Sequence, residues 1–412
     1  MTDRSIDEIQ GRIDGRTAKV MTASEFKGLP EGERRSVDVV TCGTFGIMSG
    51  TMAILTVPVA SPGTFKRADS ITINGVRGSV GPCPNESLGL VDCIFHGTAH
   101  RDRSYGGGHL FKDMVAGKPL DVVVESDGAT YGRTVTLDDI PFARMVLTRG
   151  AFKNYTGFVN GSDSEYATIF SGPEPMGPGL SEASVSGCGS INPLQNDPGM
   201  RFIHHGASAL LNGAPGMVLG TGTRSSEEKP NLSIEADMHR MDADYMGGFR
   251  TSAGPECLTS VAVAIPMTCD GAFSDASVTD AGSRLPLADV RDRRPVFTDS
   301  YASVWDGTDH TVSSDLDNCI HCDGCSADSV CPVDADPSKG IDPDRCMSCG
   351  LCVRACPGNV FSAYLGSVSY GDREVPITVR QSSRDKAERL CSILKEEIED
   401  GNWSLRCFDG RL

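Results

Sequence analysis

Eight of the sixteen cysteines in the chain lie between residues 319 and 356, in two runs that each end in Cys-Pro. In the spacing Cys-x2-Cys-x2-Cys-x3-Cys-Pro, three thiolates hold one [4Fe-4S] cluster and the fourth ligates a second cluster. The second run has this spacing, and the first has a longer gap before its last cysteine. We therefore predict two [4Fe-4S] clusters. The predicted ligands are Cys319, Cys322, Cys325 and Cys356 for cluster one, and Cys346, Cys349, Cys352 and Cys331 for cluster two.

Zinc and disulfides are the rival explanations of this cysteine pattern. Zinc sites use four ligands and separate their Cys pairs by a longer knuckle, whereas this segment interleaves eight cysteines with two Cys-Pro steps. Disulfides are rare where thiols stay reduced, as we expect for this chain. Residues 319–356 resemble the two-cluster ferredoxins, and this resemblance implies that the segment carries electrons to a reaction elsewhere in the chain.

Length and composition limit the possible classes of protein. With 412 residues the chain is long enough for two or three domains and a sizeable core. It contains no run of eighteen apolar residues, and residues 1–7 lack the features of a signal peptide, so we expect a cytoplasmic protein without a membrane partner. The net charge of -17 argues against nucleic acid as a partner, because phosphate binding requires a basic face.

Three cysteines outside the ferredoxin-like segment lie in turns rich in glycine or proline. Cys42 follows a predicted strand at 37–40 and opens a Gly-rich turn, Cys83 lies between two prolines, and Cys188 lies between two glycines. Such turns leave a thiol little cover, and their N–H groups can stabilise a thiolate. We predict Cys42, Cys83 and Cys188 as catalytic thiols in one pocket. A buried packing role explains Cys42 equally well, and a further metal or cluster on the three thiols is another alternative.

Glycine-rich stretches near histidine, hydroxyl and guanidinium groups predict where a substrate binds. Three consecutive glycines at 106–108 cost backbone entropy, which favours a loop whose amides face a ligand over a merely flexible surface loop. Residues 220–224 follow an apparent strand and could hold an oxyanion. The predicted substrate-binding residues are Gly107, His109, His205, Thr223 and Arg224, although paired histidines such as 204–205 are more often structural or exposed. No P-loop is present and no GxGxxG follows a strand, so nucleotide binding is unsupported.

Helices and strands must both position these residues. Helical periodicity covers residues 5–28, and an apolar stripe at helical spacing runs through 387–398. Runs of β-branched residues predict strands at 120–125, 134–137 and 144–147. A hairpin is expected at 368–379, around Gly371 and Asp372.

Four motifs resemble the homocysteine biosynthesis (DUF39) family. They are residues 37–46, 106–109, 191–194 and 220–224. The fusion to a two-cluster ferredoxin is similar to the methanogenesis marker 16 metalloproteins, and the resemblance covers nearly the whole chain. In relatives without the ferredoxin, a tail like 366–405 follows the catalytic core directly. The ferredoxin therefore looks inserted.

This resemblance implies a domain organisation and a fold class. Residues 1–310 would form the first part of a catalytic domain, residues 311–365 an inserted 2[4Fe-4S] ferredoxin domain, and residues 366–412 a return to the catalytic domain as a hairpin plus a C-terminal helix. The expected fold class is α+β: a large Gly-rich mixed α/β catalytic domain with an inserted bacterial-type ferredoxin domain of βαββαβ-like form.

The family resemblance also implies reductive sulfur chemistry. Its members include L-aspartate semialdehyde sulfurtransferase, and the marker 16 branch is associated with the last step of coenzyme M synthesis. We therefore expect an iron-sulfur enzyme that converts sulfoacetaldehyde, sulfide and two electrons to 2-mercaptoethanesulfonate. Its expected partners are a small anionic aldehyde, a sulfide or persulfide donor and an external electron donor, with a homo-oligomer left open.

Two departures from the sulfurtransferase branch leave alternatives open. That branch has a reactive Cys just after Gly-Thr-Phe-Gly, where this chain has Ile47, Met48 and Ser49, and residues 126–130 lack the second expected Cys. Homocysteine synthesis from L-aspartate semialdehyde is the alternative reaction. A non-catalytic iron-sulfur carrier of electrons or sulfur is the alternative from another class of protein.

Overall fold

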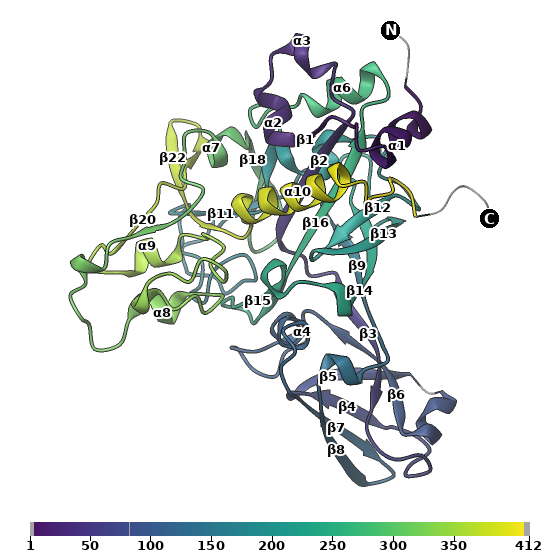
Figure 1. The fold of residues 1–412 in the computed structure, drawn as a ribbon. Coiled ribbons are helices and arrows are strands. Elements are labelled where there is room, and N and C mark those ends of the chain that lie inside the picture. Colours follow the sequence, from purple (N-terminus) through teal and green to yellow (C-terminus); the bar gives the residue numbers. More distant parts are fainter. Residues whose placement is uncertain (1–3, 82, 408–412) are drawn as a thin grey trace.

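Two β-sheets carry the mixed α/β fold of the chain, which the computed structural model describes for residues 4–81 and 83–407 (Figure 1). In spatial order, the larger sheet consists of β1 (Val20–Thr22), β2 (Val39–Ile47), β16 (Glu256–Pro266), β12 (Ser208–Leu211), β13 (Ala214–Thr221), β14 (Leu232–Asp237), β9 (Phe142–Gly150), β3 (Thr51–Pro58), β6 (Leu90–His96), β5 (Val76–Gly81), β4 (Ser70–Ile73), β7 (Leu120–Ser126) and β8 (Ala129–Val135), with β15 (Gly247–Phe249) paired to β16. The smaller sheet consists of β18 (Pro295–Ser300), β17 (Arg284–Asp289), β10 (Gly157–Val159), β11 (Ala183–Val185), β22 (Arg373–Arg380) and β21 (Ser367–Tyr370).

The helices are short apart from the last. They are α1 (Ile6–Asp14), α2 (Ala23–Gly28), α3 (Glu31–Arg34), α4 (Gly107–Val115), α5 (Pro193–Asn196), α6 (Asp270–Ala276), α7 (Ala302–Trp305), α8 (Ser326–Val330), α9 (Leu351–Ala355) and α10 (Arg384–Glu399). The Ser383 side chain caps α10 by accepting from Lys386 N. Leu390, Leu394 and Ile398 form its buried face, which packs beside β1, β2 and β16. None of the helices in the described ranges is long and apolar enough to cross a membrane.

Glycines in β2 let α10 lie close against the sheet. We predicted a strand at 37–40 followed by a Gly-rich turn, but β2 continues as a strand to Ile47. A Cβ at Gly43 would come within 2.7 Å of Cys391 Sγ and 2.9 Å of Ala387 O, both on α10. The glycine therefore permits close packing of helix on strand and does not bend the chain.

The consecutive glycines at 106–108 also serve packing. They begin α4 and do not form a ligand-facing loop, because a Cβ at Gly107 would come within 2.2 Å of His96 O and one at Gly108 within 2.4 Å of Gly247 O. The helix predicted over 5–28 is likewise interrupted, since β1 occupies 20–22 and pairs in parallel with β2. In contrast, the strand predicted at 120–125 is confirmed as β7, whose residues alternate between buried and exposed.

The cysteine-rich segment has little regular structure. A two-stranded pair joins its ends, β19 (Ser313–Ser314) with β20 (Phe361–Ser362), and α8 and α9 lie between them. The βαββαβ-like form that we expected is not seen in the described residues. The stretch between Cys331 and Cys346 contains Pro332, Pro337 and Pro343, which cannot donate to a β-ladder, and Asp334 and Asp336 have positive φ.

Candidate active site

A cavity of about 390 Å³ lies between the two sheets, near the ends of several strands. The larger sheet contributes Arg149 from the end of β9 and Glu256 from the start of β16. The smaller sheet contributes Ser186 and Gln381, which follow β11 and β22. The end of β2 and the turn to β3 close another side with Ile47, Met48 and Ser49. Small ligands commonly bind in such a cavity between packed layers.

Four cationic side chains line this cavity, and we call them the cavity cations: Arg149, Arg224, Lys229 and Arg293. Among the residues that the structure describes, none of them forms an ion pair with a carboxylate. Lys229 Nζ donates to Thr156 Oγ1 over 2.7 Å, and the Arg293 guanidinium lies 4.3 Å from the centre of the Phe170 ring. Unpaired cations around one cavity favour an anionic ligand.

Glu256 is the acidic residue of the cavity lining. Its side chain is 5% exposed, and Oε2 has no hydrogen-bond partner in the described part of the chain. Burial raises the pKa of the Glu256 carboxyl, and this effect outweighs Ser49 and Arg149, which lower it. The buried hydroxyl of Tyr155, another lining residue, also lacks a partner within the described ranges. Because unpaired buried polar atoms are costly, both groups indicate where a bound ligand would complete the hydrogen bonding.

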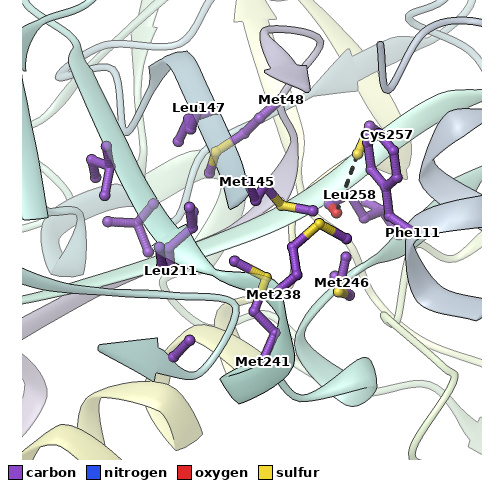
Figure 2. Close-up of a cluster of buried hydrophobic side chains, with 14 of the residues drawn as sticks. Met48, Phe111, Met145, Leu147, Leu211, Met238, Met241, Met246, Cys257 and Leu258 are labelled. Carbon is purple, nitrogen blue, oxygen red and sulfur yellow. Dashed lines mark hydrogen bonds between the residues drawn. The ribbon is translucent and has the colours of Figure 1, made fainter. Parts of the chain in front are cut away.

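The turn between β2 and β3 is held by the core behind it. Met48 N donates to Cys257 O over 2.9 Å, and a Cβ at Gly50 would come within 2.8 Å of Thr148 Oγ1. Met48 packs with a methionine-rich group that includes Met145 and Met238 (Figure 2). Methionine fills irregular space well, so this core gives the cavity wall a packed but adaptable support.

Of the five predicted substrate-binding residues, Arg224 lines the cavity. Thr223 is its exposed neighbour, and Thr223 N donates to Thr148 O. The structure does not bring the other three to this cavity. Gly107 and His109 are on α4, where the His109 ring packs on Gly248, and His205 is exposed with its Nδ1 3.1 Å from Leu219 O.

The three predicted catalytic thiols do not share a pocket. Cys42, within β2, and Cys188, beside it, are 0% exposed, and burial raises their pKa to about 12 and about 11. Cys188 Sγ lies 3.7 Å from Thr44 Oγ1, Phe45 O and Ser383 O. The Cys83 thiol donates to Asp92 Oδ2 over 2.9 Å, and Asp92 belongs to β6, a strand in the lower lobe of Figure 1. That hydrogen bond raises the pKa of Cys83, so the thiol is not activated there.

The eight cysteines of the ferredoxin-like segment surround two separate cavities. One, of about 220 Å³, is lined by Cys319, Cys322, Cys325 and Cys356, which we call the outer cysteine set. The other, of about 20 Å³, is lined by Cys331, Cys346, Cys349 and Cys352, the inner cysteine set. The structure thus groups the eight cysteines as the spacing predicts.

The donor atoms of these sets fit polynuclear clusters. In the described ranges, no three Cys, His, Asp or Glu side chains converge tightly enough to hold a single metal ion. The four thiols around the cavity of about 220 Å³ suit a larger group, whereas the inner set, around about 20 Å³, would have to move apart to hold one. Backbone N–H groups point at sulfur, from Ala335 to Cys331 Sγ and from Ser348 to Cys346 Sγ, each over 3.3 Å. Such hydrogen bonds stabilise thiolate ligands.

The inner cysteine set lies against the rest of the molecule. Arg380 N donates to Cys349 O over 3.0 Å, and Arg250 N donates to Pro332 O over 2.9 Å. Arg380 is followed by Gln381, which lines the cavity between the sheets. The residue that contacts the inner cysteine set, Arg380, is therefore the direct neighbour of a residue that lines the cavity.

Most of the cavity residues could not be found from local sequence patterns. Arg149, Lys229 and Arg293 come from three distant turns and strand ends, and each looks like an ordinary surface cation in the sequence. Glu256 does carry a signal, because it begins an apolar strand, β16, in which almost every residue is buried. Because burying a carboxylate costs free energy, a glutamate at the start of such a strand indicates a functional role.

The structure thus has a cavity lined by four cationic side chains and, beside it, a cysteine-rich segment with two sets of four cysteines. The chain belongs to the family described as "Homocysteine biosynthesis enzyme, sulfur-incorporation", whose model matches residues 18–405. This match confirms the resemblance seen in the sequence. The family is one of enzymes that incorporate sulfur.

Three relatives show how the parts of the chain are shared. An uncharacterized protein of Methanothermobacter thermautotrophicus is 45% identical over 412 residues, covering 97% of this chain and 94% of the relative. The L-aspartate semialdehyde sulfurtransferase of Methanosarcina acetivorans is 28% identical over 329 residues, covering 75% and 64%. An uncharacterized ferredoxin of Methanocaldococcus jannaschii is 40% identical over 94 residues, covering 19% and 62%. No solved structure matches the chain.

Proposed function

We propose that the chain catalyses reductive sulfur insertion into a small anionic aldehyde, with sulfoacetaldehyde as substrate and 2-mercaptoethanesulfonate, coenzyme M, as product. The observation that carries this proposal is the group of unpaired cavity cations in a member of a sulfur-incorporating family. The reaction balances, because an aldehyde, hydrogen sulfide, two electrons and two protons give a thiol and water.

The charge of the cavity favours a sulfonate over an amino acid. A sulfonate oxygen can accept from Arg224, Arg293 and the other cavity cations. Aspartate semialdehyde also carries an ammonium group, which would be repelled by these cations. Its one acidic partner in the lining would be Glu256, and burial, which raises the pKa of that carboxyl, disfavours the charged form that an ammonium needs. An aldehyde with an anion and no ammonium therefore suits the cavity better.

The cavity also favours sulfide that arrives as a small anion. Cysteine does not occur among its lining residues, and Cys188, two residues beyond Ser186, is fully buried. The cavity cations attract hydrosulfide as they attract the sulfonate. We therefore propose free hydrosulfide, or hydrosulfide released by a persulfide donor, as the form in which sulfur enters.

The two cysteine sets would give the electrons a direction. When bound, [4Fe-4S] clusters transfer electrons one at a time. Cys322 of the outer set and its neighbour Ile320 are exposed, Ile320 by 62%, so an external electron donor would dock there. Cys331 and Cys349 of the inner set are buried, and Cys349 O accepts from Arg380 N, so electrons would leave from that side toward the cavity.

The test is to give anaerobically purified holoprotein sulfide, a low-potential reductant and either aldehyde, and to identify the thiol formed. We expect 2-mercaptoethanesulfonate from sulfoacetaldehyde and about eight irons per chain, since each of two clusters holds four. No thiol from sulfoacetaldehyde would refute the proposed substrate. Iron near four per chain would refute two clusters.

Homocysteine formation from L-aspartate semialdehyde is the second candidate. It is favoured by the name of the Methanosarcina acetivorans relative, which shares 28% identity with this chain. In that reaction Glu256 would have to be ionised to pair with the substrate ammonium. Homocysteine as the sole product of the assay would establish this candidate. If the protein converts neither aldehyde, the remaining candidate is a non-catalytic carrier of electrons or sulfur.

A further inference from the structure

We propose that Glu256 is the proton donor that releases water from the adduct of sulfide and aldehyde. This inference rests on the proposed function and adds a catalytic residue to it. Glu256 projects into the cavity from the first residue of β16, whose register with β2 pairs Leu258 with Ile47. β15 supports it from the other side, with Phe249 opposite Glu256. The backbone of Glu256 is therefore held by β15, and its side chain lines the cavity.

The free oxygen of Glu256 needs a partner that the protein does not supply. Oε2 is buried and unpaired among the described residues, although Ser49 and Arg149 lie close to the carboxyl. A structural carboxylate in the core would be fully hydrogen-bonded or ion-paired. The unpaired Oε2 of Glu256 is free to form a hydrogen bond with a ligand, as a proton donor to that ligand must.

Charged groups face Glu256 from the elements packed around it. Arg149 comes from β9, and His100 comes from the loop after β6. The remaining cavity cations, Arg224, Lys229 and Arg293, share the lining. Tyr155 is a poorer acid because burial raises its pKa further. Burial raises the pKa of the Glu256 carboxyl, and a raised pKa is the direction that favours a carboxylic acid as proton donor.

The proposed step balances in atoms and charge. Hydrosulfide adds to the aldehyde carbon and gives a hydroxythiolate. A sulfur lone pair then forms the C=S bond while the C–O bond breaks, and Glu256 gives its proton to the departing hydroxyl, which leaves as water. The products are a thioaldehyde and the Glu256 carboxylate, which regains a proton from solvent. Reduction of the thioaldehyde follows and does not involve Glu256.

The test compares Glu256→Gln with Glu235→Gln in the holoprotein, using whichever aldehyde the wild type converts. Glu235 is a matched control, because it lies on β14, outside the cavity lining, and pairs with Arg144 over 3.6 Å. We expect Glu256→Gln to lower kcat by about 100-fold or more, the range for loss of a general acid, with little change in KM. Ethanesulfonate binding, measured by calorimetry, should be unchanged. Glu235→Gln should keep the wild-type kcat.

The pH profile separates catalysis from a structural role. A proton donor works only when protonated, so wild-type kcat should fall as pH rises through the pKa of Glu256, and Glu256→Gln should lose this limb. A folded-state pKa above the unfolded value means that ionisation destabilises the fold as pH rises. Glu256→Gln should therefore be more stable than wild type at high pH and equal to it at low pH.

The outcomes distinguish this inference from the proposed function. If the wild type converts an aldehyde and Glu256→Gln keeps kcat within about threefold, well short of the loss typical of a missing acid, Glu256 is not the donor although the function stands. A rise in KM with unchanged kcat would instead make Glu256 a binding residue. If the wild type converts neither aldehyde, both proposals fail.

Discussion

The cavity between the sheets and the buried thiols of Cys42 and Cys188 use neighbouring residues of the same chain segments. Residues 47–49, Ser186 and Gln381 line the cavity, whereas Phe45 O and Ser383 O contact Cys188 Sγ. The cavity has charge and an unpaired acid but no described cysteine. The buried region has reactive residue types, Cys42 and Cys188, without access. Access to the cavity, more than the type of side chain, therefore determines which of these residues can meet a substrate.

The glycines around Cys188 explain why the sequence predicted an accessible thiol where the structure has a buried one. Gly187 and Gly189 flank Cys188 and both have positive φ, and a Cβ at Gly187 would come within 2.4 Å of Tyr301 Oη. These glycines let the chain pack tightly and so cover the thiol. A glycine-flanked cysteine therefore marks close packing here, whereas the cysteines of 319–356 lie in the two sets of four that their spacing predicts.

The largest effect expected in this comparison comes from removing a cavity cation. Arg293→Ala should raise KM for the anionic aldehyde ~10- to 100-fold, since a hydrogen bond to a charged group contributes about 1.5–3 kcal/mol. Arg294→Ala is the matched control, because the neighbouring Arg294 pairs with Asp292 outside this cavity. Steady-state kinetics of both variants measure the difference. Equal KM values would mean that the cavity is not the substrate site.

A medium effect, on stability and not on activity, is expected from Cys188→Ala. Loss of a buried side chain in a packed core costs about 1–2 kcal/mol, and the Thr44 hydroxyl loses its contact with sulfur. Cys391→Ala is a control of equal burial, on α10, and should lose a similar amount. Denaturant unfolding measures the stability of both.

The opposite result would reverse the comparison. If Cys188→Ala unfolds like the wild type but loses kcat by about 100-fold or more, comparable to the loss of a catalytic group, the thiol carries sulfur after all. In that case the segments around Phe45 and Ser383 would have to open during turnover, because the thiol is fully buried.

The sequence predicts those parts of the molecule that are specified by local pattern. β7 follows from alternation, and the grouping of cysteines at 319–356 follows from spacing, since both patterns lie within a few tens of residues. The cavity does not follow, because Arg149, Arg224 and Arg293 meet only after the two sheets have packed. Long strands with glycine, such as β2, also look like turns until the helix that covers them is known.

The smallest effect is expected from Cys83→Ala. Its thiol donates to Asp92 on β6, a strand at the lower end of the view in Figure 1, whereas residues of β9, β16 and the smaller sheet line the cavity. Loss of one half-exposed hydrogen bond costs about 1 kcal/mol or less. Neither Cys83 nor Asp92 is among the residues that line the cavity. We therefore expect kcat/KM within about twofold of wild type and wild-type iron content, well inside the range of neutral surface substitutions. Loss of bound sulfane sulfur in this variant alone would make Cys83 a sulfur carrier, and sulfur would then have to travel to the cavity.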